Sequence, residues 1–166
     1  IYNLQWFRFY IYTTFNYIFS IIIVIFYLLK IALHFNTAKE EYMTPSLSSL
    51  YPSIFMVSMV IGSYIYEYFT VFAKAIWIIA IIIHIIVFTY LHLIKSRDIN
   101  TFLPTWVVTY NGIMVSSVVG ANMNANKFLT FIVYYGILIY FLILPFMIWR
   151  LRKFEIKDTM QHGTAI

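Results

Sequence analysis

The sequence predicts an all-α integral membrane protein with about five transmembrane helices. Of its 166 residues, 63% are hydrophobic and only 10% are charged, whereas roughly 25% of the residues of a soluble domain are charged. The apolar residues also gather into stretches of about 20, the length that crosses a hydrocarbon core of about 30 Å as a helix. Lipid is therefore the expected solvent for most of the surface.

Five apolar segments follow one another within a single transmembrane domain, residues 1–166. The predicted helices cover residues 12–33, 45–66, 71–93, 100–119 and 128–149, with the start of a further helix near 160–166. Trp6 and Tyr10 precede the first helix and suit the aromatic belt at the membrane interface. The first residue is Ile1 and no signal peptide is recognised, so we expect the chain to be part of a longer protein.

The positive charges predict the orientation, because Lys and Arg are enriched in cytoplasmic connections. Around the first and third connections and after the last helix lie Lys30, Lys39, Lys95, Arg97, Arg150, Arg152, Lys153 and Lys157. The opposite side holds Arg8, Lys74 and Lys127. We therefore expect a multi-pass protein of the plasma membrane, with the odd-numbered connections in the cytoplasm and "RLRKFEIK" (150–157) as an anchor near anionic lipid.

Several classes of function are not indicated. The net charge is +5, but the longest basic run is "RLRK" at 150–153, so nucleic acid is not an expected partner. There is no cysteine, no carboxylate pair, no metal-ligand spacing and no glycine-rich phosphate loop. We expect neither an enzyme nor a cofactor or metal site.

The second and fourth predicted helices differ from the other three, which are rich in Ile, Leu, Phe and Tyr. At helical spacing, one face of the second carries Ser49, Pro52, Met56, Met59 and Ser63, and one face of the fourth carries Thr105, Thr109, Gly112, Ser116 and Gly120. Each of these faces is therefore small or polar.

Two interpretations of these faces remain open. Gly112, Ser116 and Gly120 form a small-residue ridge that lets another helix approach closely, which requires no function. Alternatively, both faces line a polar path, because interrupted helices at membrane depth are tolerated where protein or water satisfies the backbone. Pro45, Pro52 and Pro104 interrupt the two helices and favour the second interpretation.

"SSLYPSIFM" (48–56) and "TFLPTWVVTYNGIMVSS" (101–117) resemble the third and fifth helices of the tellurite-resistance/C4-dicarboxylate transporter family, which includes slow-type anion channels and malate permeases. The resemblance implies a ten-helix fold of five hairpins, with odd-numbered helices around a pore and this chain covering about helices two to six. It also implies a small anionic solute and a homotrimer. The phenylalanine that plugs the family's pore lies outside this chain, and Asn111 stands where the family implies an apolar residue.

The resemblance and the polar faces together give the predicted path. Its residues are Ser49, Pro52, Ser53, Met56, Pro104, Thr105, Thr109, Gly112, Ser116 and Gly120. No Lys or Arg lies at mid-membrane depth among them, so hydroxyls, backbone N–H groups and helix ends would hold an anion weakly, as conduction requires. The predicted function is a channel or transporter for C4-dicarboxylates or for small inorganic anions and oxyanions.

His84, in the third predicted helix, allows two roles. The plainer one is a neutral imidazole bonded to a neighbouring backbone or hydroxyl group, and the other is a proton relay. His84 and His92 share a helix face, so with His34 or His162 they could ligate haem iron. A haem-carrying or anchoring subunit of a respiratory complex is therefore the alternative function, and a non-conducting scaffold is a third.

Overall fold

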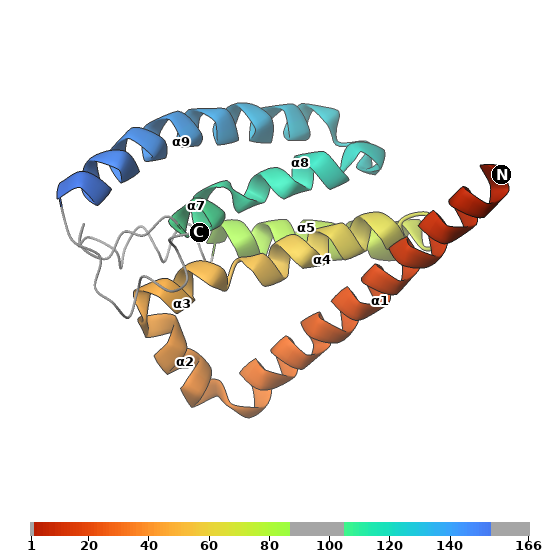
Figure 1. Cartoon of the computed structure of the whole chain (residues 1–166), viewed down its shortest axis with the longest axis horizontal. Helices are drawn as coiled ribbons and strands as arrows, with labels where there is room; N and C mark the ends of the chain where they lie inside the picture. The colour runs from red at the N-terminus through yellow and green to blue at the C-terminus, as the bar shows by residue number, and fades with distance from the viewer. Residues whose placement is uncertain (1, 87–104, 154–166) are drawn as a thin grey trace.

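Helices are the regular elements of residues 2–86 and 105–153, which the computed structural model describes and which contain no strand. The elements are α1 (Tyr2–Leu33), α2 (Phe35–Met43), α3 (Pro45–Leu50), α4 (Ser53–Ile65), α5 (Thr70–Ile83), α7 (Trp106–Asn111), η3 (Gly112–Met114), α8 (Val115–Val119), η4 (Ala121–Met123) and α9 (Asn126–Lys153) (Figure 1). The all-α class predicted from the composition is confirmed.

Three spans are long and apolar enough to cross a membrane: Tyr10–Leu33, Leu47–Ile65 and Asn126–Lys153. Two shorter apolar stretches, Thr70–Ile86 and Trp106–Val119, lie between them in the described chain. α1 begins at Tyr2, before the predicted boundary at residue 12, and α9 extends to Lys153, beyond residue 149. Residues 87–93 and 100–104 of the predicted third and fourth helices, with Pro104, lie outside the described residues, as does the segment 160–166.

Both polar helices are interrupted. The second divides into α3 and α4 at Tyr51 and Pro52, because proline has no N–H group for the helix ladder. After this break the N–H groups of Phe55 and Met56 both donate to the Pro52 carbonyl, at 3.1 and 3.2 Å. The fourth changes from α7 to a 3₁₀ turn at Gly112, and α8 continues from Val115. Residues 84–86, which follow α5, have π-helical conformation.

α1 packs against α4 and α2, and its membrane-spanning part has no buried residue within the described chain (Figure 1). Tyrosines join the two helices near the N-terminus of α1. The rings of Tyr17 and Tyr64 stack with centroids 3.9 Å apart, and the hydroxyls of Tyr10 and Tyr68 lie 3.2 Å apart. These amphipathic rings are suited to a membrane interface.

α2, which the sequence analysis did not predict, lies between α1 and α3 and is held by one acidic side chain. Lys30 Nζ donates to both carboxylate oxygens of Glu41, at 2.7 and 2.6 Å. The Tyr51 hydroxyl donates to Glu41 Oε2 at 2.9 Å and contacts the Ala38 carbonyl at 3.2 Å. This cluster ties the end of α1 and all of α2 to the residue that precedes the Pro52 break.

The apolar core joins α4, α5, the turns beside α8, and α9. Its buried members are Met59, Trp77, Ala80, Ile81, Ile113, Met123, Leu129 and Ile132. Glycines allow the close contacts: a Cβ at Gly62 would lie 3.4 Å from Trp77 Cβ, and a Cβ at Gly120 would lie 2.7 Å from Trp77 Cζ2. Trp77 of α5 therefore fills the space that two glycines leave open.

The described basic side chains divide between the two ends of the bundle. The last turns of α1 and α9 lie at the end of the bundle that carries α2, and the first turns of α1, α5 and α9 lie at the other end (Figure 1). The first end therefore has Lys30, Lys39, Arg150, Arg152 and Lys153, and the second has Arg8, Lys74 and Lys127. Arg150 differs from the predicted lipid anchor, because only 1% of its surface is exposed in the described chain. Arg152 and Lys153 are exposed, so their role as an anchor near anionic lipid stays a prediction.

We predict that Gly120→Ala destabilises the fold. The added methyl group would collide with the Ser116 carbonyl and with Trp77, and overpacking of this kind costs about 1–3 kcal/mol. Thermal unfolding in detergent measures the effect, and Ala121→Val at the neighbouring exposed position is the control. An equal melting temperature for Gly120→Ala and wild type would contradict the assigned helix contact.

We predict a pH dependence from Glu41, whose pKa is held below its usual 4.5 by hydrogen bonds from Lys30 and Tyr51. A lowered pKa stabilises the fold above pH 4.5, and this contribution is lost as the pH falls through the lowered value. The stability difference between wild type and Glu41→Gln should therefore be constant from about pH 7 to 5 and shrink below 4.5. A stability difference between the two proteins that stays unchanged to about pH 3 would contradict the hydrogen bonds of Glu41 with Lys30 and Tyr51.

Candidate functional site

The polar faces of α3–α4 and α7–α8 meet each other inside the bundle. Ser49 Oγ donates to Thr105 Oγ1 at 2.5 Å, and Thr109 Oγ1 donates to the Ser49 carbonyl at 3.3 Å. Ser49 lies in the turn of α3 before the proline break, where helix hydrogen bonding is interrupted. The two broken helices thus supply each other's hydrogen-bond partners at membrane depth.

His84 of α5 completes this arrangement. Its Nε2 lies 3.2 Å from the Thr109 carbonyl, and the ring also interacts with the backbone of Pro52. A Cβ at Gly112 would lie 2.8 Å from His84 Cε1 and 2.8 Å from Met56 Sδ, so the absence of a side chain there admits both groups. We call Ser49, Thr105, Thr109 and His84 the polar seam.

The polar seam is closed to solvent in this structure. Ser49, Thr109 and His84 are 0% exposed, and Thr105 is half-buried. Burying a hydroxyl or an imidazole is costly unless it is hydrogen-bonded. The hydroxyls of Ser49 and Thr109 and the Nε2 atom of His84 meet this requirement through contacts between helices. The seam therefore fixes α3, α5 and α7 against one another in a definite register. His84 Nε2 lies beside a backbone carbonyl, the contact that the plainer of its two predicted roles requires, and both roles stay predictions.

The small-residue ridge lies on the same side of the helix as the seam. Ser116 is 0% exposed and donates to the Ile113 carbonyl of its own helix at 2.7 Å. Gly112 faces Met56 and His84, and Gly120 faces Trp77. The geometry of these three residues is that of a close helix contact with α4 and α5.

The remaining predicted path residues occupy different positions. Pro52 is buried beside His84, Met56 is half-buried against Gly112, and Ser53 is exposed with its hydroxyl donating to the Leu50 carbonyl at 2.7 Å. Pro104 lies outside the described residues. Of the predicted set, Ser53 and Met56 are the residues of α4 nearest to an uncovered surface.

α7 and α8 have a side that no described helix covers. They lie between α9 and the α4–α5 pair (Figure 1), and Val118 of α8 is 79% exposed. Asn111 lies two helical turns before Val118 and is half-buried at the change from α7 to η3. We group Ser53, Met56, Asn111 and Val118, each exposed or half-buried in the described chain, under the name open face. Sequence reasoning noticed Asn111 as an unexpected residue but gave it no role.

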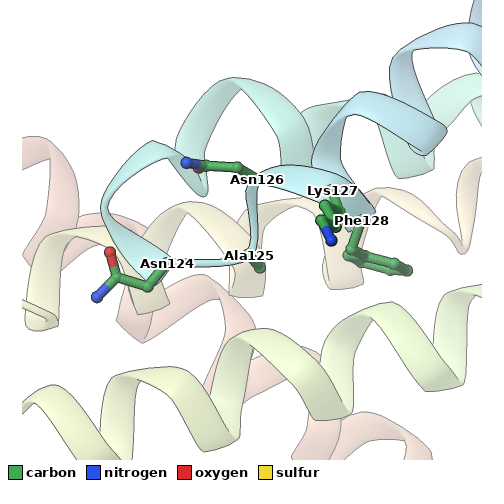
Figure 2. Close-up of a pocket in the computed structure, with 5 residues that line it drawn as sticks. All are labelled: Asn124, Ala125, Asn126, Lys127 and Phe128. Atoms are coloured by element: carbon green, nitrogen blue, oxygen red, sulfur yellow. The ribbon is translucent and has the colours of Figure 1, made fainter.

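A shallow pocket of about 470 Å³ lies at the end of the bundle opposite α2. Asn124, Ala125, Asn126, Lys127 and Phe128 line it around the turn that leads into α9, as Figure 2 shows. Asn124 has a left-handed backbone conformation with φ of 56°, which Asn tolerates better than most residues. The pocket lies at the far end of α8 from the polar seam (Figure 1).

The histidines considered for haem do not form a described cluster. His84 is buried in the seam and His34 is exposed between α1 and α2. His92 and His162 lie outside the described residues. Among the residues that the structure describes, no group of three or more His, Asp or Glu side chains is arranged to hold a metal ion.

Comparison with known protein families gave a match over nearly the whole chain. The family model SLAC1, described as voltage-dependent anion channel, matches residues 2–166 and so covers nearly the whole chain. No curated protein and no solved structure matches the chain.

We predict a measurable coupling between Ser49 and Thr105. In a double-mutant cycle of Ser49→Ala and Thr105→Val, the interaction energy should be about 0.6 kcal/mol and at most about 1.7 kcal/mol, the range for hydrogen bonds between membrane helices. Unfolding in a detergent series measures it. Pairing Thr105→Val with Ser58→Ala is the control, since Ser58 bonds the Ile54 carbonyl of its own helix. An interaction energy of zero in the Ser49→Ala/Thr105→Val cycle, equal to that of the control cycle, would contradict the hydrogen bond between these side chains in the polar seam.

Proposed function

Because the chain belongs to the SLAC1 family of voltage-dependent anion channels, we propose that it forms part of a path for small anions that runs along the open face. Membership makes the protein a membrane channel or transporter, and members of this family are not enzymes. The observation that supports this path is the pair of interrupted helices, α3–α4 and α7–α8. Their buried sides meet in the polar seam, and Ser53 of α4 and Val118 of α8 are exposed in the described chain.

In this proposal the predicted path residues divide into two groups. Ser53 and Met56 line the path directly. The second group forms the wall behind the path: Ser49, Pro52, Thr105, Thr109, Gly112, Ser116 and Gly120. Pro104, also predicted for the path, lies outside the described residues. A wall held by hydrogen bonds between helices keeps the interrupted backbone out of contact with lipid.

The proposed solutes are C4-dicarboxylates such as malate and small inorganic anions or oxyanions. None of the described path residues is Lys or Arg, so hydroxyl and amide dipoles would carry the interaction with an anion. Such groups bind weakly, and weak binding allows an ion to leave as readily as it enters. We further propose that the complete protein is a homotrimer in the plasma membrane, with the α2 end in the cytoplasm.

Proton-coupled transport is a second candidate, and the position of His84 in the seam favours it. Intramembrane ionisable residues often serve as relays, and His84 bonds the backbone of both interrupted helices. A pH gradient imposed on loaded liposomes separates the two mechanisms. Uphill anion uptake in wild type that is lost in His84→Gln would establish coupling, whereas equal downhill flux in both proteins would establish passive conduction.

We predict that the full-length protein in liposomes carries an anion-selective current. Ser53→Leu should reduce chloride, nitrate or malate flux at least about threefold, because a larger apolar side chain narrows the path and removes a hydroxyl from it. Ser20→Leu on α1 is the matched control, since each serine hydroxyl donates to a carbonyl of its own chain segment, at 2.8 Å for Ser20 and 2.7 Å for Ser53.

Two outcomes would count against the proposal. A reversal potential that follows the cation gradient would exclude an anion path altogether. Equal anion flux through wild type, Ser53→Leu and Ser20→Leu would leave the family function in place and remove the open face as the route.

A further inference from the structure

Asn111 is a carboxamide at membrane depth that the polar seam does not use. On the buried side of α7, hydrogen bonds join the residues of the polar seam: Ser49, Thr105, Thr109 and His84. Asn111 is the last residue of α7 and lies on a different side of that helix. It has φ of −102° and ψ of −7°, and the 3₁₀ turn of η3 starts at the next residue. A polar amide at such a break calls for a partner, because hydrocarbon supplies none.

The oxygen and the nitrogen of the Asn111 side-chain amide differ in their surroundings. The oxygen Oδ1 is buried and has no partner among the described residues. The nitrogen Nδ2 is not a buried unpartnered atom, and no side-chain hydrogen bond of Asn111 is found in the described part of the chain. The NH₂ group therefore lies at the accessible side of the residue, with two N–H donors available.

The side to which the NH₂ group belongs is the open face. Met56 of α4, which is half-buried, packs at Gly112, the residue after Asn111, so α4 and the end of α7 are in contact at this level. Val118, two turns further along, is 79% exposed. An amide facing lipid here would lose its hydrogen bonds to water without replacement. An aqueous solute on this side would restore them.

We propose that Asn111 contacts the permeating anion and donates an Nδ2–H hydrogen bond to it where α7 changes to η3. This inference rests on the proposed anion path and adds a specificity-determining residue to it. An amide N–H is a directional donor that suits the oxygen atoms of carboxylates and oxyanions. Asn111 thus favours oxygen-bearing anions over halides of similar charge.

Charge and donor variants test the proposal by flux. In the full-length protein in liposomes, Asn111→Asp should lower malate and nitrate flux at least about tenfold, because a carboxylate in the path repels anions. Asn111→Gln keeps the donor and should retain the ratio of malate to chloride flux, whereas Asn111→Leu should lower that ratio. Asn36→Asp, an equal charge change on exposed α2, should leave flux unchanged.

Chemical accessibility provides an independent readout, and the absence of cysteine from the sequence makes single-cysteine variants straightforward. Asn111→Cys should react with a membrane-impermeant anionic thiol reagent, and excess malate should slow the reaction. Ser116→Cys, at a 0% exposed position, should not react. An unreactive Asn111→Cys, or modification at a rate that malate does not change, would overturn the proposal.

The flux results separate failure of this inference from failure of the proposed function. Wild-type anion flux with unaltered magnitude and selectivity in all Asn111 variants would overturn the role of Asn111 and leave the anion path standing. Absence of anion flux in wild type would overturn the path itself.

Discussion

Hydrocarbon can neither donate nor accept a hydrogen bond, and this constraint determines how the two interrupted helices are arranged. Proline and glycine interrupt α3–α4 and α7–α8, which leaves backbone groups there without helical hydrogen bonds. Hydroxyl side chains add further polar atoms. The hydrogen bonds of Ser49 with Thr105 and Thr109, and of His84 with the Thr109 carbonyl, satisfy these groups across helices rather than along them. The remaining helices can then be almost wholly apolar.

The other contacts of the bundle follow from this central one. Trp77 packs where Gly62 and Gly120 leave room, which brings α5 close to both interrupted helices. α9 closes the opposite side of α7–α8, where Met114 packs against Gly136. At the α2 end, Glu41 joins Lys30 to Tyr51, so the position of the Pro52 break is tied to the connection between α1 and α3.

The sequence was sufficient for the fold class and for the choice of the two unusual helices. Composition and segment length predict the membrane helices, and Pro52 and Gly112 mark the interruptions. The contacts could not be predicted in the same way. Helical spacing places Ser49 and Thr109 each on a polar face, but it does not tell whether those faces meet each other or water, because both arrangements satisfy the same atoms. The burial of His84 and Arg150 could not be predicted for a related reason, because the burial of one side chain in a helix depends on the helices packed around it. The roles proposed for Ser53, Met56 and Asn111 remain predictions.

The central claim is that the polar seam is a fixed contact beside the anion path and does not open during conduction. A disulfide across the seam tests it most directly. The side-chain oxygens of Ser49 and Thr105 are 2.5 Å apart, so cysteines at these positions lie within reach of a bond, and the sequence has no other cysteine to compete. Oxidation of Ser49→Cys/Thr105→Cys in liposomes should form the cross-link and leave anion flux as it was before oxidation. Loss of flux on cross-linking, restored by reduction, would show that the seam itself must part for anions to pass.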